Sequence, residues 1–367
     1  MEGIVLSFLL YNVIMWLIYS HYKRGEYKIS NKNLIWFTVL FVALGTYGNH
    51  IGDYWRLNEV IELYGSTSTF DIGKSMEEQY YMLAKFVNGN YVLWRLVINA
   101  IAFIGLAFFL RKANMDNYPT LLLFAAMCLF WVAGHRGRWG YIYYYFGVFL
   151  FFKNKNPLYL LLAALSYFSH SSVVLLLALL PFSFFKFNRY LAIFAIIALV
   201  FGMGFFQDYF DSIALNGLDN EYYSHKVETY AGQTANNFFG SSIGEYLQNF
   251  FSMVPMYLFM FYMSKKMLFD RSFTENMGRE YNAVANVSII LFFVSIMAYF
   301  MNLGSGTIAY RILTMSTFPI IILYPYVLTA EKERYVPKMT KWFFVSTELV
   351  YLFSTYYAFM HPDYFMN

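Results

Sequence analysis

Apolar stretches long enough to cross a lipid bilayer recur from one end of this 367-residue chain to the other. They fall at residues 4–20, 33–48, 91–110, 118–134, 139–152, 157–185, 190–207, 246–263, 281–302, 307–329 and 342–360. Charged residues make up 13% of the chain, about half of the fraction that is usual in soluble domains. The sequence therefore predicts an all-α polytopic integral membrane protein, with residues 1–367 forming a single membrane domain.

The run at 157–185 decides the topology, because Ser169-His170-Ser171-Ser172 and Pro181 interrupt it and allow either one helix or a hairpin of two short helices. With a hairpin, one side of the membrane holds the links 21–32, 111–117, 153–156, 186–189, 264–280 and 331–341. These six links carry 18 of the 26 Lys and Arg residues, as the positive-inside rule expects of cytoplasmic loops. We therefore predict about 12 transmembrane segments, both termini outside, and His170 at the tip of a hairpin that opens outward.

Helix length predicts the depth of two polar tips. Each arm of the hairpin has about 13 residues, or about 20 Å of helix, against a hydrocarbon core of about 30 Å. The two helices that flank His135-Arg136-Gly137-Arg138 are similarly short, so both tips should lie below the outward membrane surface. The two long outward loops, 49–90 and 208–245, are rich in Tyr, Asn, Gly and acidic residues, and we expect them to be partly helical lids.

Arginines within membrane segments are the strongest functional candidates in the sequence. Arg136 and Arg138 lie between two apolar runs, and Arg311 is the only formally charged residue between Glu280 and Glu331. A guanidinium group can form paired hydrogen bonds with a phosphate or pyrophosphate. Each has a plainer alternative, since Arg136 and Arg138 can be interface anchors and Arg311 can pair with a buried acid.

Two residues are candidates for activating a hydroxyl group. His170 can be a general base or a phosphate ligand, or else a hydrogen-bonded residue at a helix start. Asp53 can accept a hydroxyl proton or bind a sugar, or else cap a helix in the first long loop. Arg95, at the start of the third apolar run, is a further candidate phosphate contact, but it can equally pair with Asp53 or Glu78.

Aromatic and polar residues near these positions are candidates for binding a saccharide. They are Tyr54, Arg56, His135, Tyr310, Glu221 and Tyr230. The sequence has no Walker A, HExxH or GxSxG motif, and Asp208 and Asp211 do not have the spacing of a calcium loop. We therefore expect no metal, no cofactor and no nucleic acid partner.

Five segments together resemble the EpsG-type, Wzy-like bacterial polymerases of O-antigen and exopolysaccharide. They are Asp53-Tyr54, EEQYYMLAKFVNGN (77–90), GHRGRWG (134–140), LLLAALSYFSHSSVVLLLALLP (160–181) and Tyr310-Arg311. The resemblance runs along most of the chain. It departs in the arginine turn, where the family more often has an arginine, then Gln, Gly or a small residue, then Ala. Either Arg136 or Arg138 can therefore hold the family position.

The resemblance implies a GT-C-like, metal-independent glycosyltransferase of the bacterial inner membrane, with its active site facing the periplasm. Such an enzyme joins undecaprenyl-pyrophosphate-linked oligosaccharide repeat units, and a chain-length regulator protein is a further expected partner. Arg136, Arg138, Arg311 and Arg95 would bind the pyrophosphate, which gains charge as it leaves, and His170 or Asp53 would be catalytic. The alternatives are an O-antigen ligase-like transferase, a flippase or transporter of the lipid-linked sugar and, with less support, a membrane acyltransferase.

Overall fold

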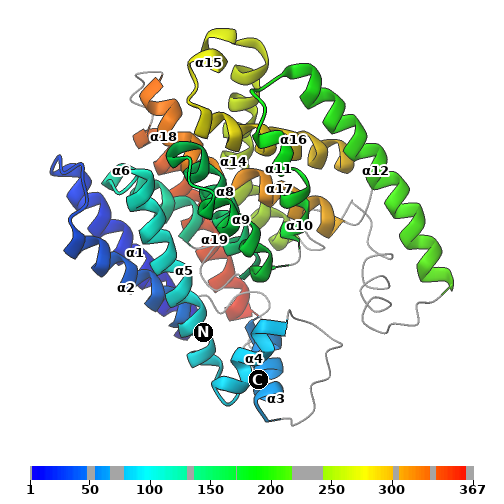
Figure 1. Cartoon of the computed structure of the whole chain (residues 1–367). Helices are drawn as coiled ribbons and strands as arrows, with labels where there is room; N and C mark the ends of the chain where they lie inside the picture. The colour runs from blue at the N-terminus through cyan, green and yellow to red at the C-terminus, as the bar shows by residue number, and fades with distance from the viewer. Residues whose placement is uncertain are drawn as a thin grey trace.

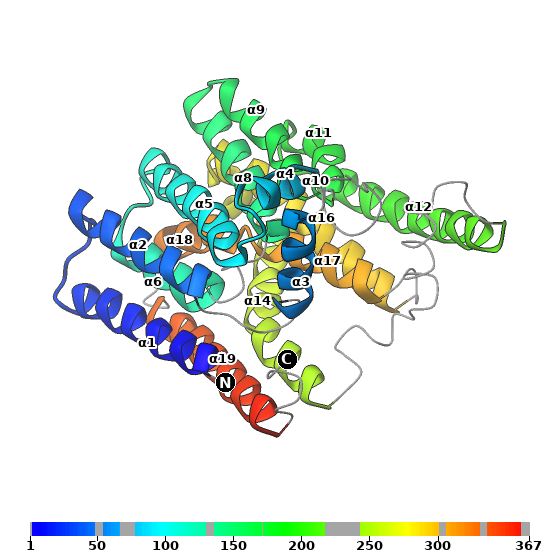
Figure 2. The same cartoon turned by 90° about the horizontal axis from the view of Figure 1, so that it is seen from below.

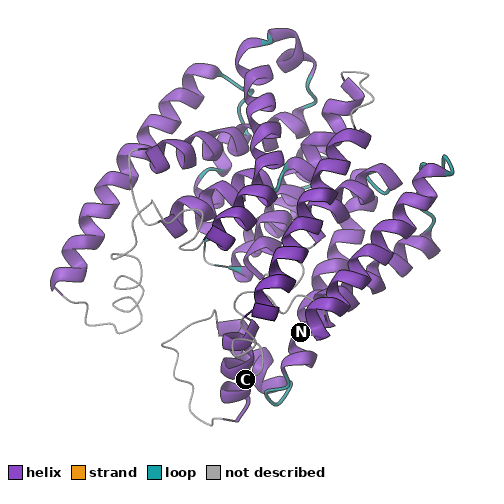
Figure 3. Ribbon diagram, turned by 180° about the vertical axis from the view of Figure 1, so that it is seen from behind, coloured by secondary structure: helices purple, strands orange, loops and turns teal. Residues whose placement is uncertain are grey.

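The computed structural model describes residues 2–47, 54–66, 78–129, 136–170, 172–216, 243–300, 306–330 and 336–360. All regular elements among these residues are helices (Figures 1 and 3), and pairing of extended backbone there is limited to one bridge between Lys28 and Asn117. The all-α expectation is therefore confirmed.

The first half of the chain contains α1 (Glu2–Lys23), α2 (Asn31–Tyr47), α3 (Tyr54–Ser66), α4 (Glu78–Phe86), α5 (Tyr91–Ala113), α6 (Tyr118–Phe124), the π-helix η1 (Ala125–Leu129), α8 (Arg136–Asn154), α9 (Leu158–Leu165) and the 3-10 helix η2 (Ser166–Ser169). The second half contains α10 (Val173–Ala178), α11 (Leu180–Ser183), α12 (Arg189–Asn216), α14 (Ile243–Phe269), α15 (Arg271–Asn276), α16 (Arg279–Phe300), α17 (Gly306–Thr317), α18 (Ile320–Ala330) and α19 (Val336–Met360).

Several of these helices suit a lipid environment. Within the described residues, three are both long and apolar enough to cross a membrane, namely Val5–Lys23, Tyr91–Ala113 and Arg279–Met297. Shorter apolar helices are Tyr118–Met127, Leu158–Ser169, Arg189–Gly202 and Ile312–Val327. Large apolar side chains are exposed on the outer helices, with Trp16 67% and Phe201 74% exposed. A soluble domain rarely exposes so much apolar surface, so we take these faces to be in contact with lipid.

Helices α8 and α16 form the centre of the bundle. Tyr144 and Phe149 on α8 and Leu291 on α16 are fully buried. A Cβ atom added at Gly147 would lie 2.8 Å from the carbonyl oxygen of Tyr159, so only glycine lets α8 and α9 approach this closely. In contrast, α12 extends away from the bundle along much of its length (Figures 1 and 2).

The first three basic links lie together. The backbone N–H of Ile29 donates to the carbonyl of Asp116 at 3.0 Å, which joins links 21–32 and 111–117. The ammonium group of Lys153 donates to the carbonyl of Ala113, which brings link 153–156 to the same place.

The next two basic links are at the same end of the bundle. The guanidinium group of Arg279 lies over the ring of Phe152, at 4.8 Å from its centroid. The backbone N–H of Phe187 donates to Asn282 Oδ1 at 3.0 Å. Five of the six predicted same-side links are therefore in contact at one end, which we call the basic end.

The run at 157–185 is a hairpin, as the charge distribution predicts. The chain leaves the basic end through α9 and returns to it through α10 and α11. This return is shown by the ring of Phe184, directly after α11, which lies 5.3 Å from the ring of Phe152, near the end of α8. Asn286 Nδ2 on α16 donates to the carbonyl of Phe185 at 2.8 Å and fixes the returning arm. His170 lies at the turn between the two arms.

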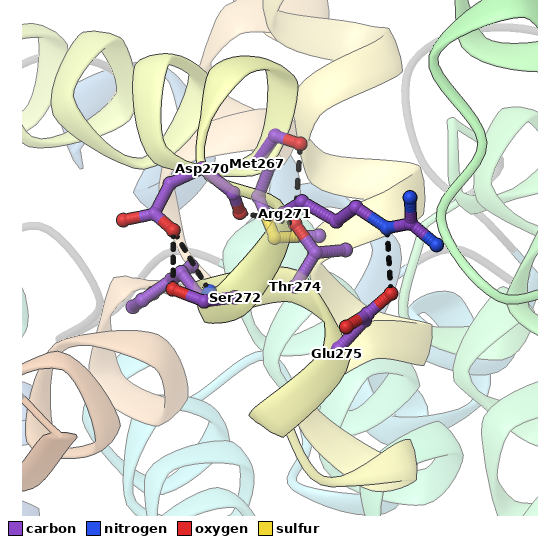
Figure 4. A network of polar contacts seen from close by, with 7 residues as sticks. Met267, Asp270, Arg271, Ser272, Thr274 and Glu275 are labelled. Carbon is purple, nitrogen blue, oxygen red and sulfur yellow. Dashed lines mark hydrogen bonds and ion pairs between the residues drawn. The ribbon is translucent and has the colours of Figure 1, made fainter.

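A short helix caps the basic end. Asp270 is the N-cap of α15 and accepts hydrogen bonds from Phe273 N–H at 3.0 Å and Ser272 Oγ at 2.8 Å (Figure 4). These hydrogen bonds, first of all the one from the backbone of Phe273, lower the pKa of the Asp270 carboxyl group. In the same helix, Arg271 Nε lies 2.7 Å from Glu275 Oε1, in an exposed ion pair.

One predicted boundary differs from the structure. The run at 307–329 consists of α17 and α18, separated at Phe318-Pro319, because proline has no N–H for the helical hydrogen bond and disfavours helical backbone before it.

The second lid, at 208–245, was expected to be partly helical. Helix α12 continues into it as far as Asn216, and α14 begins at Ile243. Residues 217–242 lie outside the described residues, so the role of this segment as a lid stays a prediction.

The π-helix η1 depends on the two terminal helices. The carbonyl of Ala126 accepts hydrogen bonds from Tyr11 on α1, at 3.4 Å, and from Thr347 on α19, at 2.9 Å. Tyr11 also packs against Tyr351 of α19, with ring centroids 5.4 Å apart. Figure 2 shows α1 and α19 side by side.

Candidate functional site

The candidate residues that the structure describes lie away from the basic end, toward the opposite end of the bundle, which we call the site end. Here α8 begins at Arg136, α17 begins at Gly306, and the hairpin turns at His170. The helices α3 and α4 lie at this end as well (Figure 1).

His170 is part of a hydrogen-bonded chain that reaches α8. Its Nδ1 atom accepts a hydrogen bond from the backbone N–H of Ser172 at 3.1 Å, and Ser172 Oγ lies 2.7 Å from the same nitrogen. The hydroxyl of Tyr141, on α8, lies 2.7 Å from Ser172 Oγ. Tyr141 is buried and His170 is partly buried, so the imidazole has a fixed orientation but keeps some exposure.

A glycine allows α8 to meet the hairpin tip. A Cβ atom added at Gly140 would lie 2.7 Å from Val173 Cγ2, 3.1 Å from the Ser166 carbonyl oxygen and 3.2 Å from Ser169 Cβ. Any side chain at this position would push the hairpin away from α8. Gly140 therefore keeps the hairpin tip, which carries His170, against α8. Arg138 lies three residues before Tyr141, about one turn away on the same face of α8.

Helix α4 covers the hairpin tip. The hydroxyl of Tyr80 donates to the carbonyl of Ser169 at 2.8 Å, and Gln79 Nε2 donates to the carbonyl of Phe168. Trp94 Nε1 on α5 donates to the carbonyl of Tyr80 at 3.1 Å and fixes α4 from its other side. Two of the motif segments quoted above, 77–90 and 160–181, are thus in direct contact.

Arg138, on α8, lies level with a point about halfway along the neighbouring helix α16 or slightly beyond, counted from the basic end. The antiparallel helices α8 and α16 are aligned by Phe149 and Tyr281, whose ring centroids are 5.0 Å apart. Arg138 is about eleven residues from Phe149, and the same distance along α16 from Tyr281 leads to Phe292. Arg138 is partly buried.

Arg311 reaches a similar depth from α17. Ser288 Oγ on α16 donates to the carbonyl of Ser316 on α17 at 2.6 Å, which aligns this antiparallel pair. Arg311 is about five residues before Ser316, and about five residues beyond Ser288 is Phe293. The backbones of Arg138 and Arg311 therefore lie within about one helical turn, or about 5 Å, of each other along α16.

Arg95 has a different setting. It is only 4% exposed, and its guanidinium group donates to the carbonyl of Gly45 at 2.5 Å, which ties α5 to α2. The rings of Phe103 and Trp139 align α5 with α8, with centroids 4.7 Å apart, so Arg95 lies about 10 Å farther out than Trp139. The structure thus does not bring Arg95 to the depth of Arg138, and its contact with pyrophosphate stays a prediction.

Other predicted site residues cannot be compared with the structure in full. Asp53, His135, Glu221 and Tyr230 lie outside the described residues. For a second group the helix position is described and the side chain is not, namely Tyr54 and Arg56 on α3, Arg136 on α8, and Tyr310 and Arg311 on α17. In the described part of the chain, no group of three His, Cys, Asp or Glu residues could hold a metal ion.

Three residues around His170 did not emerge from the sequence as site residues. Ser172 and Tyr141 orient the imidazole, and Tyr80 holds the covering helix. Tyr141 is one of four tyrosines, with Tyr143, Tyr144 and Tyr145, that follow the arginine turn in the sequence. Their spacing does not separate Tyr141 from Tyr143, whose hydroxyl donates to the carbonyl of Ala102 instead.

These features define an integral membrane protein whose described residues are helical, with a short helix against the turn that carries His170 and with basic links at the other end. Residues 32–366 match the EpsG family, so the chain belongs to that family, and the resemblance noted in the sequence is confirmed. It is accordingly a membrane protein of polysaccharide-polymerase type. Comparison with curated proteins and with solved structures gave no match.

Proposed function

We propose that this protein is a polysaccharide polymerase that joins undecaprenyl-pyrophosphate-linked oligosaccharide repeat units on the outer face of the bacterial inner membrane. One observation carries the proposal: a member of the EpsG family has Arg138 one helical turn from Tyr141, which is hydrogen-bonded through Ser172 to His170, away from the basic end. By the positive-inside rule the basic end is cytoplasmic, so the site end faces outward.

In the proposed reaction, a hydroxyl oxygen of the acceptor saccharide attacks the anomeric carbon of the donor. The bond between that carbon and the pyrophosphate oxygen breaks, and undecaprenyl pyrophosphate leaves with the electron pair. The hydroxyl proton passes to a base, for which Asp53 and His170 are the candidates. The reaction has the character of a GT-C-like, metal-independent glycosyl transfer.

Arginines supply the main stabilisation in this proposal. As the pyrophosphate leaves, it gains negative charge, and fixed guanidinium groups in a water-poor site stabilise that charge strongly. Arg138 and Arg311 are the first candidates because their backbones share a depth in the bundle. Arg136 and Arg95 are further candidates, and Tyr54, Arg56, His135, Tyr310, Glu221 and Tyr230 are proposed to contact the saccharide.

Two other functions use the same substrate. An O-antigen ligase-like transferase would pass the saccharide to a lipid A core, and a flippase would move the lipid-linked sugar across the membrane unchanged. A flippase needs cationic groups along a path that is open to both sides, whereas Arg138 and Arg311 share one depth. The polymerase is therefore favoured, and a chain-length regulator remains a proposed partner.

A reconstituted reaction tests the proposal. The full-length protein in liposomes would receive lipid-linked repeat units, EDTA and no nucleotide, and the products would be separated by size. A ladder of lengthened chains is expected. Substrate that crosses the membrane without lengthening would indicate the flippase, and transfer of single units to an added lipid A core would indicate the ligase.

A further inference from the structure

The hydrogen bonds around His170 determine which of its ring nitrogens carries the proton. A backbone N–H group can only donate, so the bond from Ser172 N–H to Nδ1, at 3.1 Å, requires a lone pair on Nδ1. In a neutral imidazole the other nitrogen, Nε2, then carries the hydrogen.

The same assignment orients the hydroxyl groups behind His170. Ser172 Oγ lies 2.7 Å from Nδ1, and because Nδ1 is an acceptor the serine hydroxyl donates to it. Tyr141 lies 2.7 Å from Ser172 Oγ, and its hydroxyl donates to the serine oxygen in turn. The chain runs in one direction, from Tyr141 through Ser172 to His170.

We infer that Ser172 and Tyr141 are positioning residues that hold His170 with its proton on Nε2, so that His170 donates a hydrogen bond to an anionic oxygen of the leaving pyrophosphate. A general base would need a lone pair on Nε2, which this tautomer does not have. Arg138 lies three residues before Tyr141, about one turn away on the same face of α8, and Tyr141 belongs to the chain that ends at His170, so the imidazole and the guanidinium group can act on one anion. The inference rests on the proposed function and leaves Asp53 as the candidate base.

Nitrogen-15 NMR of histidine-labelled protein tests the tautomer without any substrate. The chain has 6 histidines, and the His170→Asn variant identifies the signals of His170 by their loss. In the full-length protein we expect Nε2 of His170 to be protonated and Nδ1 to be unprotonated. A proton on Nδ1 with a bare Nε2 would overturn the inference.

Two substitutions of His170 separate a donor from a base in the polymerisation assay. The amide nitrogen of glutamine reaches about the place of Nε2 and can donate, whereas that of asparagine reaches about the place of Nδ1, and neither amide is a base. We expect His170→Gln to stay within about tenfold of the wild-type rate and His170→Asn to lose about a hundredfold or more. Equal losses of about a hundredfold or more in both variants would identify a general base instead.

The positioning residues have a matched control. Ser172→Ala and Tyr141→Phe should each lower kcat more than they raise KM, and Ser172→Thr, which keeps a hydroxyl, should restore much of the rate. Tyr143→Phe removes the same hydroxyl group from the same helix, away from His170, and should leave the rate unchanged. Full activity of Ser172→Ala would overturn the positioning role. A wild-type protein that makes no polymer would instead refute the proposed function, and the NMR result for the tautomer of His170 would still stand.

Discussion

The hydroxyl of Tyr80 donates to the carbonyl oxygen of Ser169 at 2.8 Å, which fastens α4 to the hairpin tip one residue before His170. This contact joins two segments that are far apart in the sequence and that both belong to the resemblance described in the sequence analysis. Helix α4 therefore lies directly against the turn that carries His170.

Tyr80→Phe should loosen α4. The lost hydrogen bond contributes about 0.5–1.5 kcal/mol, so amide hydrogen exchange across 78–86 should accelerate by up to about tenfold. Exchange measured by mass spectrometry in nanodiscs checks this. Tyr19→Phe, at an exposed tyrosine of α1, is the control and should change nothing in that peptide. Unchanged exchange in Tyr80→Phe would mean that α4 is held by its other contacts.

Gly140→Leu should separate the hairpin tip from α8. The new side chain would meet Val173 and Ser166, and overpacking of this kind costs about 1–3 kcal/mol. The thermal unfolding midpoint should fall, and polymerisation should fall more steeply because Ser172 and His170 move away from Tyr141 on α8. Gly202→Leu is the matched control, since a Cβ atom at Gly202 meets nothing within 4 Å. Equal effects of the two substitutions would contradict the packing argument.

Arg311→Ala should abolish polymer and leave single repeat units on the lipid. The loss of one group that stabilises the leaving charge is expected to slow the reaction by about a hundred- to a thousandfold. Product length on a gel is the measurement. Arg271→Ala is the control, because the Arg271 side chain is 91% exposed at the basic end and should be dispensable. Long chains from well-expressed Arg311→Ala protein would remove Arg311 from the site.

The orientation of the bundle can be measured with single cysteines in a Cys128→Ala background. Glu59→Cys, on α3 at the site end, should react with a membrane-impermeant maleimide in intact spheroplasts. Arg24→Cys, in the first basic link, should react only after the membrane is opened. Both positions are exposed in the structure. The reverse labelling pattern would place the site in the cytoplasm and refute the proposed outward reaction.

The cap of α15 should respond to acid. The pKa of Asp270 is lowered in the folded protein, so its contribution to stability is fully present above the unfolded-state pKa and is lost as the pH falls through the lower folded-state pKa. An asparagine at this position also caps the helix but does not titrate, so Asp270→Asn is the reference protein. The ratio of the amide exchange rates of residues 271–276, wild type divided by Asp270→Asn, should rise as the pH falls. Glu275→Gln, which alters only an exposed ion pair, is the control. A ratio that stays constant with pH would show that the charge of Asp270 has no part in the cap.

Hydropathy and charge were sufficient to predict an all-helical membrane chain and the hairpin at 157–185. A hairpin was the only arrangement that kept the basic links on one side, and its ends do meet through Phe152 and Phe184. The break in the run at 307–329 was readable in principle from Pro319. The length of α12 was not, because polarity after an apolar run marks the edge of the lipid and not the end of a helix.

The site was only partly predictable. Arg138 and His170 stand out because polar groups are costly in a membrane, and that cost is visible in sequence. The role of Ser172 depends on a backbone N–H that points back at the imidazole, and the role of Tyr141 depends on α8 packing against the hairpin at Gly140. Such relationships arise from tertiary contacts, which hydropathy and motif spacing do not encode.

The carbonyl of Ala126 accepts one hydrogen bond from Tyr11 on α1 and one from Thr347 on α19. These donors lie 115 residues before and 221 residues after Ala126 in the sequence. Because a ribosome delivers the chain in order, η1 finds its first donor already made, but gains its second only after the helices from α8 to α18 have been synthesised. Full hydrogen bonding of η1 is therefore a late event in the assembly of the bundle.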